Sequence, residues 1–305
     1  KNMGNYYLGK WDVEKAREYF LEALIIKKEI DDKSGIAKVL SSLGNIEEDP
    51  ELSFDYYKQA LEIVNAIGDQ FTKIRIIGGL SRYYHFTNTE KAIEYTKQNI
   101  SLCKEIGDIN MLKNAFLELG RYYLPGAAPG SVDSSIHYYK LSLDLAQELG
   151  EPLAIISSLR ELGDAYYYNA ELDKTESYLL QALELTKNIS DDIYRKYDKA
   201  RALNMLAMVY AQKNLLDKAM EYAHQTIDYL SINHLDVFSN DFIMQSYDII
   251  ISIYLLRGKY DLAKTYLDIY VDRLKKDPRP QQSNPFRRSV QEHIFYKLKL
   301  NKTNA

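Results

Sequence analysis

The sequence predicts an all-α protein in which pairs of helices repeat along the chain and stack as a solenoid. Three observations predict this. A small residue recurs at intervals of 37 to 44 residues, a tyrosine follows it after three positions, and an aliphatic residue follows it after eight. These offsets lie on one face of an α-helix. A unit of this length cannot bury its apolar faces alone, whereas stacked copies can.

This register marks the second helix of each of about seven units. Because the tyrosines share a stripe with aliphatic residues, we assign them to the packing between helices. Ordered aromatics can also stack nucleic-acid bases, but that use needs a strong basic track, and the net charge is −4. The small residues are Ala16, Ser53, Ala92, Ser135, Thr175, Ala219 and Ala263, and the tyrosines are Tyr19, Tyr56, Tyr95, Tyr138, Tyr178, Tyr222 and Tyr266.

The first helix of each unit carries a weaker mark, a small residue followed three positions later by an aromatic one. It is clearest at Gly4, Gly120 and Gly163, whereas Gly44 is followed by Glu47. A glycine inside a helix costs about 1 kcal/mol relative to alanine. We therefore expect each glycine where a neighbouring helix approaches closely. The pair Gly78-Gly79 is interpreted in the same way, as close packing or a kink rather than a phosphate site.

Glycine also predicts where second helices end, at Ile67-Gly68-Asp69, Ile106-Gly107-Asp108 and Leu149-Gly150-Glu151. Glycine adopts the left-handed conformation that terminates a helix, and the following acid suits the start of the next one. Residues 124–132 form an irregular loop, interpreted as a length variant, with a partner contact as the alternative. Residues 276–285 read as a polar connector and 286–300 as a further first helix. We expect residues 1–305 to form a single array that is a piece of a longer chain.

Two sets of motifs resemble the tetratricopeptide repeat (TPR). They are Leu-Gly-x-x-Tyr at 119–123 and 162–166, and Ala-x-x-Tyr-Phe-x-x-Ala-Leu at 16–24. The resemblance covers nearly the whole chain and implies a right-handed α-solenoid of helix-turn-helix repeats. Its period of about 40 residues exceeds the 34 of the common form. Long-period arrays with Ile-Gly-Asp junctions look like the TPR regions of bacterial sensor kinases and of peptide-responsive regulators.

The sequence contains no cluster that predicts catalysis, a cofactor or a metal site. No two of its five histidines have the i, i+4 spacing of a helical zinc site, and its one cysteine, Cys103, is expected to be buried and inert. The longest apolar run, residues 249–256, is far shorter than a membrane span. We therefore predict that this segment is not an enzyme and does not cross a membrane. The cytoplasm and the periplasm both remain open as its location.

In TPR-like arrays the first helices line the concave side, which is where we expect a partner to bind. Arginines at 82, 121, 160 and 201 recur at intervals of 39 to 41 and are expected to form a column. Arginine binds carboxylates with paired hydrogen bonds, so an acidic peptide or protein segment is predicted. The alternative is that Glu118, Glu161 and Asp164 neutralise the column. The predicted binding residues are Lys38, Asn45, Arg75, Arg82, Asn114, Arg121, Arg160, Asp164, Arg201 and Asn204.

Together these features predict a binding scaffold or sensing region of a bacterial regulatory protein, which holds an extended peptide or protein segment and no nucleic acid. Repeat architecture without a catalytic cluster is the observation behind this prediction. The alternative is a structural array that associates with itself, for which a homo-oligomer is expected.

Overall fold

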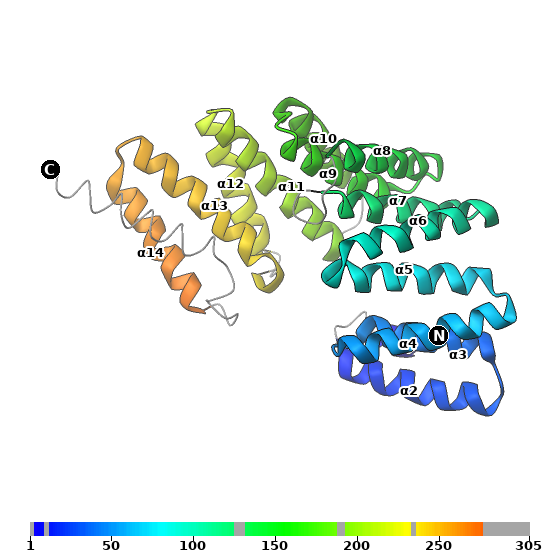
Figure 1. Ribbon diagram of the computed structural model, residues 1–305. Helices are drawn as coiled ribbons and strands as arrows, with labels where there is room; N and C mark the ends of the chain where they lie inside the picture. The colour runs from blue at the N-terminus through cyan, green and yellow to red at the C-terminus, as the bar shows by residue number, and fades with distance from the viewer. Residues whose placement is uncertain (1–2, 9–11, 125–131, 188–192, 233–235, 277–305) are drawn as a thin grey trace. The chain divides into compact units, whose positions relative to one another are not determined.

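The computed structural model describes residues 3–8, 12–124, 132–187, 193–232 and 236–276. All the regular secondary structure in these ranges is helical, as predicted. Figure 1 shows the helices, which are α1 (Met3–Leu8), α2 (Val13–Glu29), α3 (Lys33–Ile46), α4 (Pro50–Ile67), α5 (Gln70–Thr87), α6 (Thr89–Ile106), α7 (Ile109–Tyr122), α8 (Val132–Glu148), α9 (Pro152–Tyr168), α10 (Leu172–Thr186), α11 (Ile193–Gln212), α12 (Leu216–Ile232), α13 (Asp236–Leu256) and α14 (Tyr260–Lys276).

The helices follow the predicted repeat. Every even-numbered helix from α2 to α14 contains one register tyrosine, and the first residue of each first-helix mark lies in an odd-numbered helix; only in α3 is that residue, Gly44, not followed three positions later by an aromatic one. The chain is therefore an α-solenoid of helix hairpins. The predicted loop around residue 128 and the predicted helix at 286–300 lie outside the described residues. Within the described ranges, no helix combines the length and the apolar character needed to cross a bilayer.

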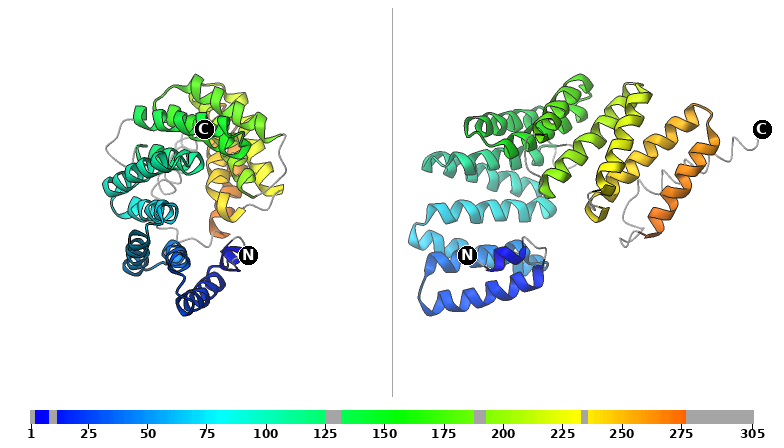
Figure 2. Two further views of the ribbon diagram at one scale, coloured as in Figure 1. Left: turned by 90° about the vertical axis from the view of Figure 1, so that its right-hand side faces the viewer. Right: turned by 180° about the vertical axis from the view of Figure 1, so that it is seen from behind.

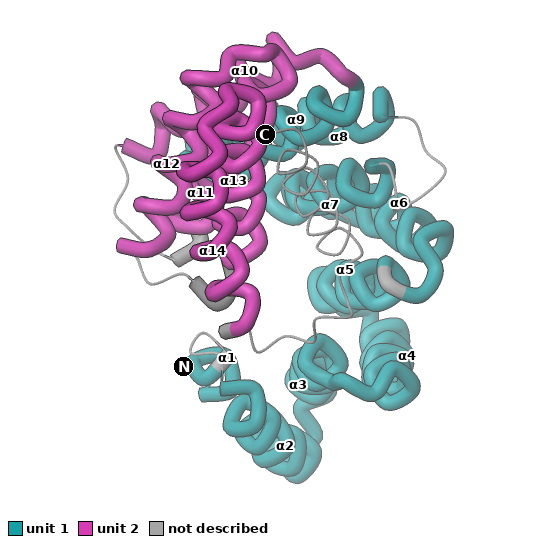
Figure 3. Tube along the Cα trace, turned by 90° about the vertical axis from the view of Figure 1, so that its left-hand side faces the viewer, with its two compact units in different colours: residues 1–169 teal, residues 170–305 magenta. Residues whose placement is uncertain are grey.

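The chain divides into two compact units, coloured separately in Figure 3. Unit 1 is Lys1–Asn169, with α1 to α9, and unit 2 is Ala170–Ala305, with α10 to α14. In unit 1 each helix packs against the next, and α5 also contacts both α3 and α7, so successive hairpins lie side by side (Figure 2). In unit 2, α11 contacts α13 in the same way. The single continuous array stays a prediction.

The register tyrosines pack between helices, but at the edge of the core rather than at its centre. Each is half-buried, whereas the residue after it is buried in all seven repeats, as Phe20 and Tyr139 illustrate. In five hairpins the ring of the register tyrosine lies against the ring of the aromatic residue in the first-helix mark, with ring centroids 5.2 to 5.8 Å apart. The aromatic residue of the first-helix mark and the register tyrosine of the second helix therefore contact each other.

The first-helix glycines make room for the buried residue that follows the register tyrosine. A Cβ atom on Gly120 would lie 2.5 Å from two ring carbons of Tyr139, and one on Gly4 would lie 2.5 Å from Phe20. Gly79 has the same role toward Tyr57, whose ring carbon would be 2.4 Å away. The expected close approach is confirmed at these positions, since real Cβ atoms do not come so near to other heavy atoms.

Glycine ends three of the second helices as predicted. Gly68, Gly107 and Gly150 have φ angles of 72°, 78° and 64°. The next helix then begins at an acidic residue, and Asp69 and Asp108 accept hydrogen bonds from backbone N–H groups of the first turn. These caps fix where each first helix starts. They therefore also fix which of its side chains face outward.

Candidate functional site

Six of the predicted binding residues are exposed on the first helices of unit 1. We call this surface the odd-helix face, and it consists of Lys38 and Asn45 on α3, Arg75 and Arg82 on α5, and Asn114 and Arg121 on α7. The two residues on each helix are seven positions apart, so they lie on one face of it. The capped helix starts and the glycine contacts behind the helices orient this face.

A network of polar contacts joins the three helices of this face. The Arg82 guanidinium donates to Glu118 of α7 over 2.9 Å and to the Asn45 side-chain oxygen of α3 over 3.2 Å. Asn45 also accepts a hydrogen bond from the hydroxyl of Tyr57 over 3.0 Å. Burial raises the pKa of Tyr57 to about 12, so this hydroxyl keeps its proton and remains a donor.

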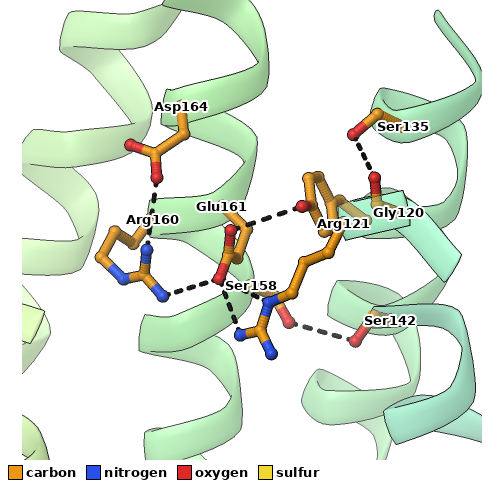
Figure 4. Close-up of polar contacts among 9 residues, drawn as sticks. Gly120, Arg121, Ser135, Ser142, Ser158, Arg160, Glu161 and Asp164 are labelled. Carbon is orange, nitrogen blue, oxygen red and sulfur yellow. Dashed lines mark hydrogen bonds and ion pairs between the residues drawn. The ribbon is translucent and has the colours of Figure 1, made fainter. Parts of the chain in front are cut away.

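The network continues from α7 to α9, where Glu161 is its centre (Figure 4). Arg121 donates from Nε and Nη2 to one oxygen of Glu161, over 2.9 and 2.7 Å. Arg160 donates to the same oxygen over 2.8 Å and to Asp164 over 3.3 Å. The hydroxyl of Tyr139 donates to the other Glu161 oxygen over 3.4 Å, and burial raises the pKa of Tyr139 far above its usual range.

These contacts are the ones expected under the alternative in which acidic residues neutralise the arginine column. Glu118, Glu161 and Asp164 each pair with an arginine of the predicted set. The arginines nevertheless differ in exposure. The side chains of Arg82 and Arg121 are 51% and 44% exposed, whereas those of Arg160 and Asp164 are 5% and 1% exposed. Arg82 and Arg121 therefore remain accessible to a partner, whereas Arg160 and Asp164 are buried and support Arg121 through the shared Glu161.

A pocket of about 280 Å³ opens on the odd-helix face between α5 and α7. We call it the α5–α7 pocket. Three predicted binding residues, Arg82, Asn114 and Arg121, line it, and so does Asn99 from α6. The remaining lining residues are Ile74, Gly78, Met111, Ala115, Leu117 and Glu118. The geometry thus gathers side chains from helices that are separated by almost forty residues of sequence.

The predicted binding residues of unit 2 are more buried than those of the odd-helix face. Asn204 is 3% exposed and is held within the unit, because it donates to Gln245 over 2.6 Å and accepts from Ser246 over 3.2 Å. Arg201 is half-buried. Asn204 was predicted to face a partner, but its amide instead joins α11 to α13.

Asp248, also on α13, has a buried carboxyl oxygen with no hydrogen-bond partner in the described residues. Burial raises the pKa of this carboxyl to about 7, so the unfolded chain loses the proton first as the pH rises. Stability should therefore fall between about pH 4 and pH 7. We expect Asp248→Asn to remove this fall and to raise the melting temperature above pH 7 by at least about 2–4 °C, the effect of 1 kcal/mol. Equal pH profiles for the variant and the parent would contradict this.

Cys103 is fully buried, as expected, and donates to Asn99 over 3.2 Å. Burial raises the pKa of its thiol to about 11. Since the thiolate is the reactive form, we expect the folded chain to resist alkylation near neutral pH and the denatured chain to react at once. Mass spectrometry after iodoacetamide treatment measures this, and rapid labelling of the folded chain would contradict it. Within the described residues, no three His, Cys, Asp or Glu side chains form a group suited to a metal ion.

Residues 200–225, in α11 and α12, match the family model described as tetratricopeptide repeat. No curated protein matches the chain by sequence. Among solved structures, the chain is similar to a signal transduction ATPase with numerous domains (STAND) from Pyrococcus horikoshii, a protein with a tetratricopeptide repeat sensor. Identity is 20% and the TM-score is 0.73, over 96% of this chain but only 42% of that protein.

Two further solved structures are similar over most of their length. One is a Rap protein complexed with competence and sporulation factor, at 14% identity and a TM-score of 0.56, covering 89% of this chain and 75% of that one. The other is the apo form of the quorum sensor NprR from B. thuringiensis, at 14% identity and a TM-score of 0.59, covering 95% and 80%. The resemblance inferred from the motifs is confirmed, and the chain has the fold of the tetratricopeptide repeat superfamily in its long-period form.

Proposed function

We propose that the odd-helix face of unit 1 binds an extended, acidic segment of a peptide or partner protein. The observation behind this proposal is that Arg82 and Arg121 stay about half exposed although both are ion-paired, and that they line one pocket together with Asn114. The chain would act as the sensing or scaffolding part of a bacterial regulatory protein.

The face has hydrogen-bond donors that its internal contacts do not use. A guanidinium has five N–H groups, and Arg121 binds Glu161 through Nε and Nη2, which leaves Nη1 for a ligand. Lys38, Arg75 and Asn114 are exposed, and their side chains make no hydrogen bond or ion pair within the described ranges. These groups suit carboxylates and the carbonyl groups of an extended backbone.

The solved structures that resemble the chain agree with this role. Their names describe a sensor, a quorum sensor and a protein in complex with a factor. Similarity of this degree concerns the fold, and the site on this chain is argued from its own side chains.

Affinity selection of random peptides on the immobilised chain tests the proposal. We expect the selected peptides to be rich in Asp and Glu and to bind more weakly as salt rises, because exposed charges are screened. Enrichment of basic or uncharged sequences would overturn it.

Self-association, the alternative function, is favoured by the exposed isoleucines of α2 and its C-cap, Ile25, Ile26 and Ile30, which are 56% to 62% exposed. Exposed apolar clusters can mark contact surfaces. Light scattering over a range of concentrations separates the two functions. We expect a monomer whose peptide binding depends on the odd-helix face. A stable oligomer that does not bind peptides would favour self-association.

A further inference from the structure

The α5–α7 pocket has two chemically different ends. At one end, Met111 and Ile74 come from the N-terminal parts of α7 and α5, and the half-buried Met111 is the more accessible, because Ile74 is only 1% exposed. At the other end, Arg82 comes from the C-terminal part of α5, and Glu118 and Arg121 come from that of α7. A ligand group that fills the pocket would therefore meet an apolar surface on one side and guanidinium groups on the other.

The floor of the pocket depends on Gly78. A Cβ atom there would lie 3.0 Å from Nδ2 of Asn99 and 3.8 Å from Nη1 of Arg82, with no other heavy atom within 4 Å. Gly79 and Gly120 differ, because aromatic rings occupy the space where their side chains would be. Glycine inside a helix costs about 1 kcal/mol. At Gly78 the nearest group is instead the polar amide of Asn99, and the space beyond Asn99 and Arg82 belongs to the pocket.

Asn99 lies beneath this opening and is fixed in place. It is 6% exposed, donates to the carbonyl of Ile74 over 3.2 Å and accepts from the thiol of Cys103. Pockets that hold whole ligands have volumes of roughly 300–1,000 Å³. At about 280 Å³ the α5–α7 pocket lies at the lower edge of this range, which leaves space for one side chain and the group next to it.

We propose that the α5–α7 pocket is the anchor subsite of the odd-helix face, and that it takes one large apolar side chain of the ligand with a carboxylate directly beside it. The side chain lies beside Gly78 against Met111, and the carboxylate binds Arg82 and Nη1 of Arg121. This carboxylate comes from a neighbouring Asp or Glu or from the C-terminus of a peptide. The inference rests on the proposed function and adds a requirement for an apolar residue.

A series of fluorescein-labelled peptides on a Gly-Ser background tests the subsite. The parent peptide contains one Leu-Glu pair, and its relatives contain Ser-Glu, Leu-Gln, or a terminal leucine with a free or an amidated carboxylate. For the unaltered chain, we expect Ser for Leu and Gln for Glu each to weaken binding about tenfold, as measured by fluorescence polarisation. Tighter binding of the free-acid terminal leucine than of Leu-Glu would identify the C-terminus as the source of the carboxylate.

The variant Gly78→Leu should fill the pocket, and the amide of Asn99, 3.0 Å from the new Cβ atom, must shift by a few tenths of an ångström. We expect a cooperative unfolding transition, which shows that the variant folds, and equal, weak binding of the Leu-Glu and Ser-Glu peptides. If the unaltered chain binds acidic peptides but does not distinguish leucine from serine, the subsite is rejected and the proposed binding of acidic segments to the odd-helix face stands. The same holds if Gly78→Leu keeps that distinction. If no acidic peptide binds, both proposals fail.

Discussion

Reversing the charge of Arg75 and Arg82 together is expected to lower the affinity for a selected acidic peptide by about a hundredfold or more. Both arginines are exposed on α5 and lie seven positions apart on the odd-helix face. A hydrogen bond to a charged group contributes about 1.5–3 kcal/mol, so losing two of them accounts for this factor. The new carboxylates would also repel the ligand. Isothermal titration calorimetry measures the change.

Two further variants serve as controls. Lys58→Glu changes the charge of an exposed residue on the second helix α4 and should leave the affinity unchanged. The exchange Arg82→Glu with Glu118→Arg keeps an ion pair between α5 and α7 and should restore part of the binding that Arg82→Glu alone removes. If Arg75→Glu with Arg82→Glu binds like Lys58→Glu, the odd-helix face is not the binding surface.

Gly120→Ala is expected to destabilise unit 1 by about 1–3 kcal/mol, the usual cost of overpacking a core. The added methyl group would lie 2.5 Å from Cδ1 and Cε1 of Tyr139, whose side chain is fully buried. The ring cannot move freely, because its hydroxyl reaches Glu161 at the centre of the arginine network. Chemical denaturation followed by circular dichroism measures the loss.

Gly78→Ala is the matched control, since it adds the same methyl group to a glycine inside the neighbouring first helix. The Cβ atom would lie 3.0 Å from Nδ2 of Asn99 and more than 4 Å from any aromatic ring, so only the Asn99 amide must shift. We expect that small cost to offset the gain from helix propensity, so that the stability changes by less than about 1 kcal/mol. Replacing Tyr139 with Leu should also remove most of the cost of Gly120→Ala. Equal effects of Gly78→Ala and Gly120→Ala would show that the glycines are not packing positions.

The repeat could be predicted because its residues recur in one register. Its detailed packing could not, since the tyrosine at a register position and the aromatic residue after it, such as Tyr138 and Tyr139, are alike in sequence but differ in burial. Adjacent glycines present the same difficulty. Gly78 and Gly79 point in directions about 100° apart on a helix, and only the structure shows that one meets Tyr57 and the other meets the pocket.

The face that carries the candidate site was also predictable, because a spacing of seven residues keeps Arg75 in line with Arg82 and Asn114 with Arg121. The burial of Arg160 was not. It depends on neighbouring side chains and on a glutamate, Glu161, that is shared with Arg121 from the preceding hairpin. Such contacts depend on how far each hairpin is shifted along the next, which a repeat length of 37 to 44 residues leaves open.

Hydrogen–deuterium exchange of the unaltered chain, with and without a selected acidic peptide, tests most directly whether the odd-helix face binds. We expect slower exchange in α3, α5 and α7 on adding the peptide, with α4 unchanged. Slower exchange confined to α4 and α6, or to unit 2, would contradict it.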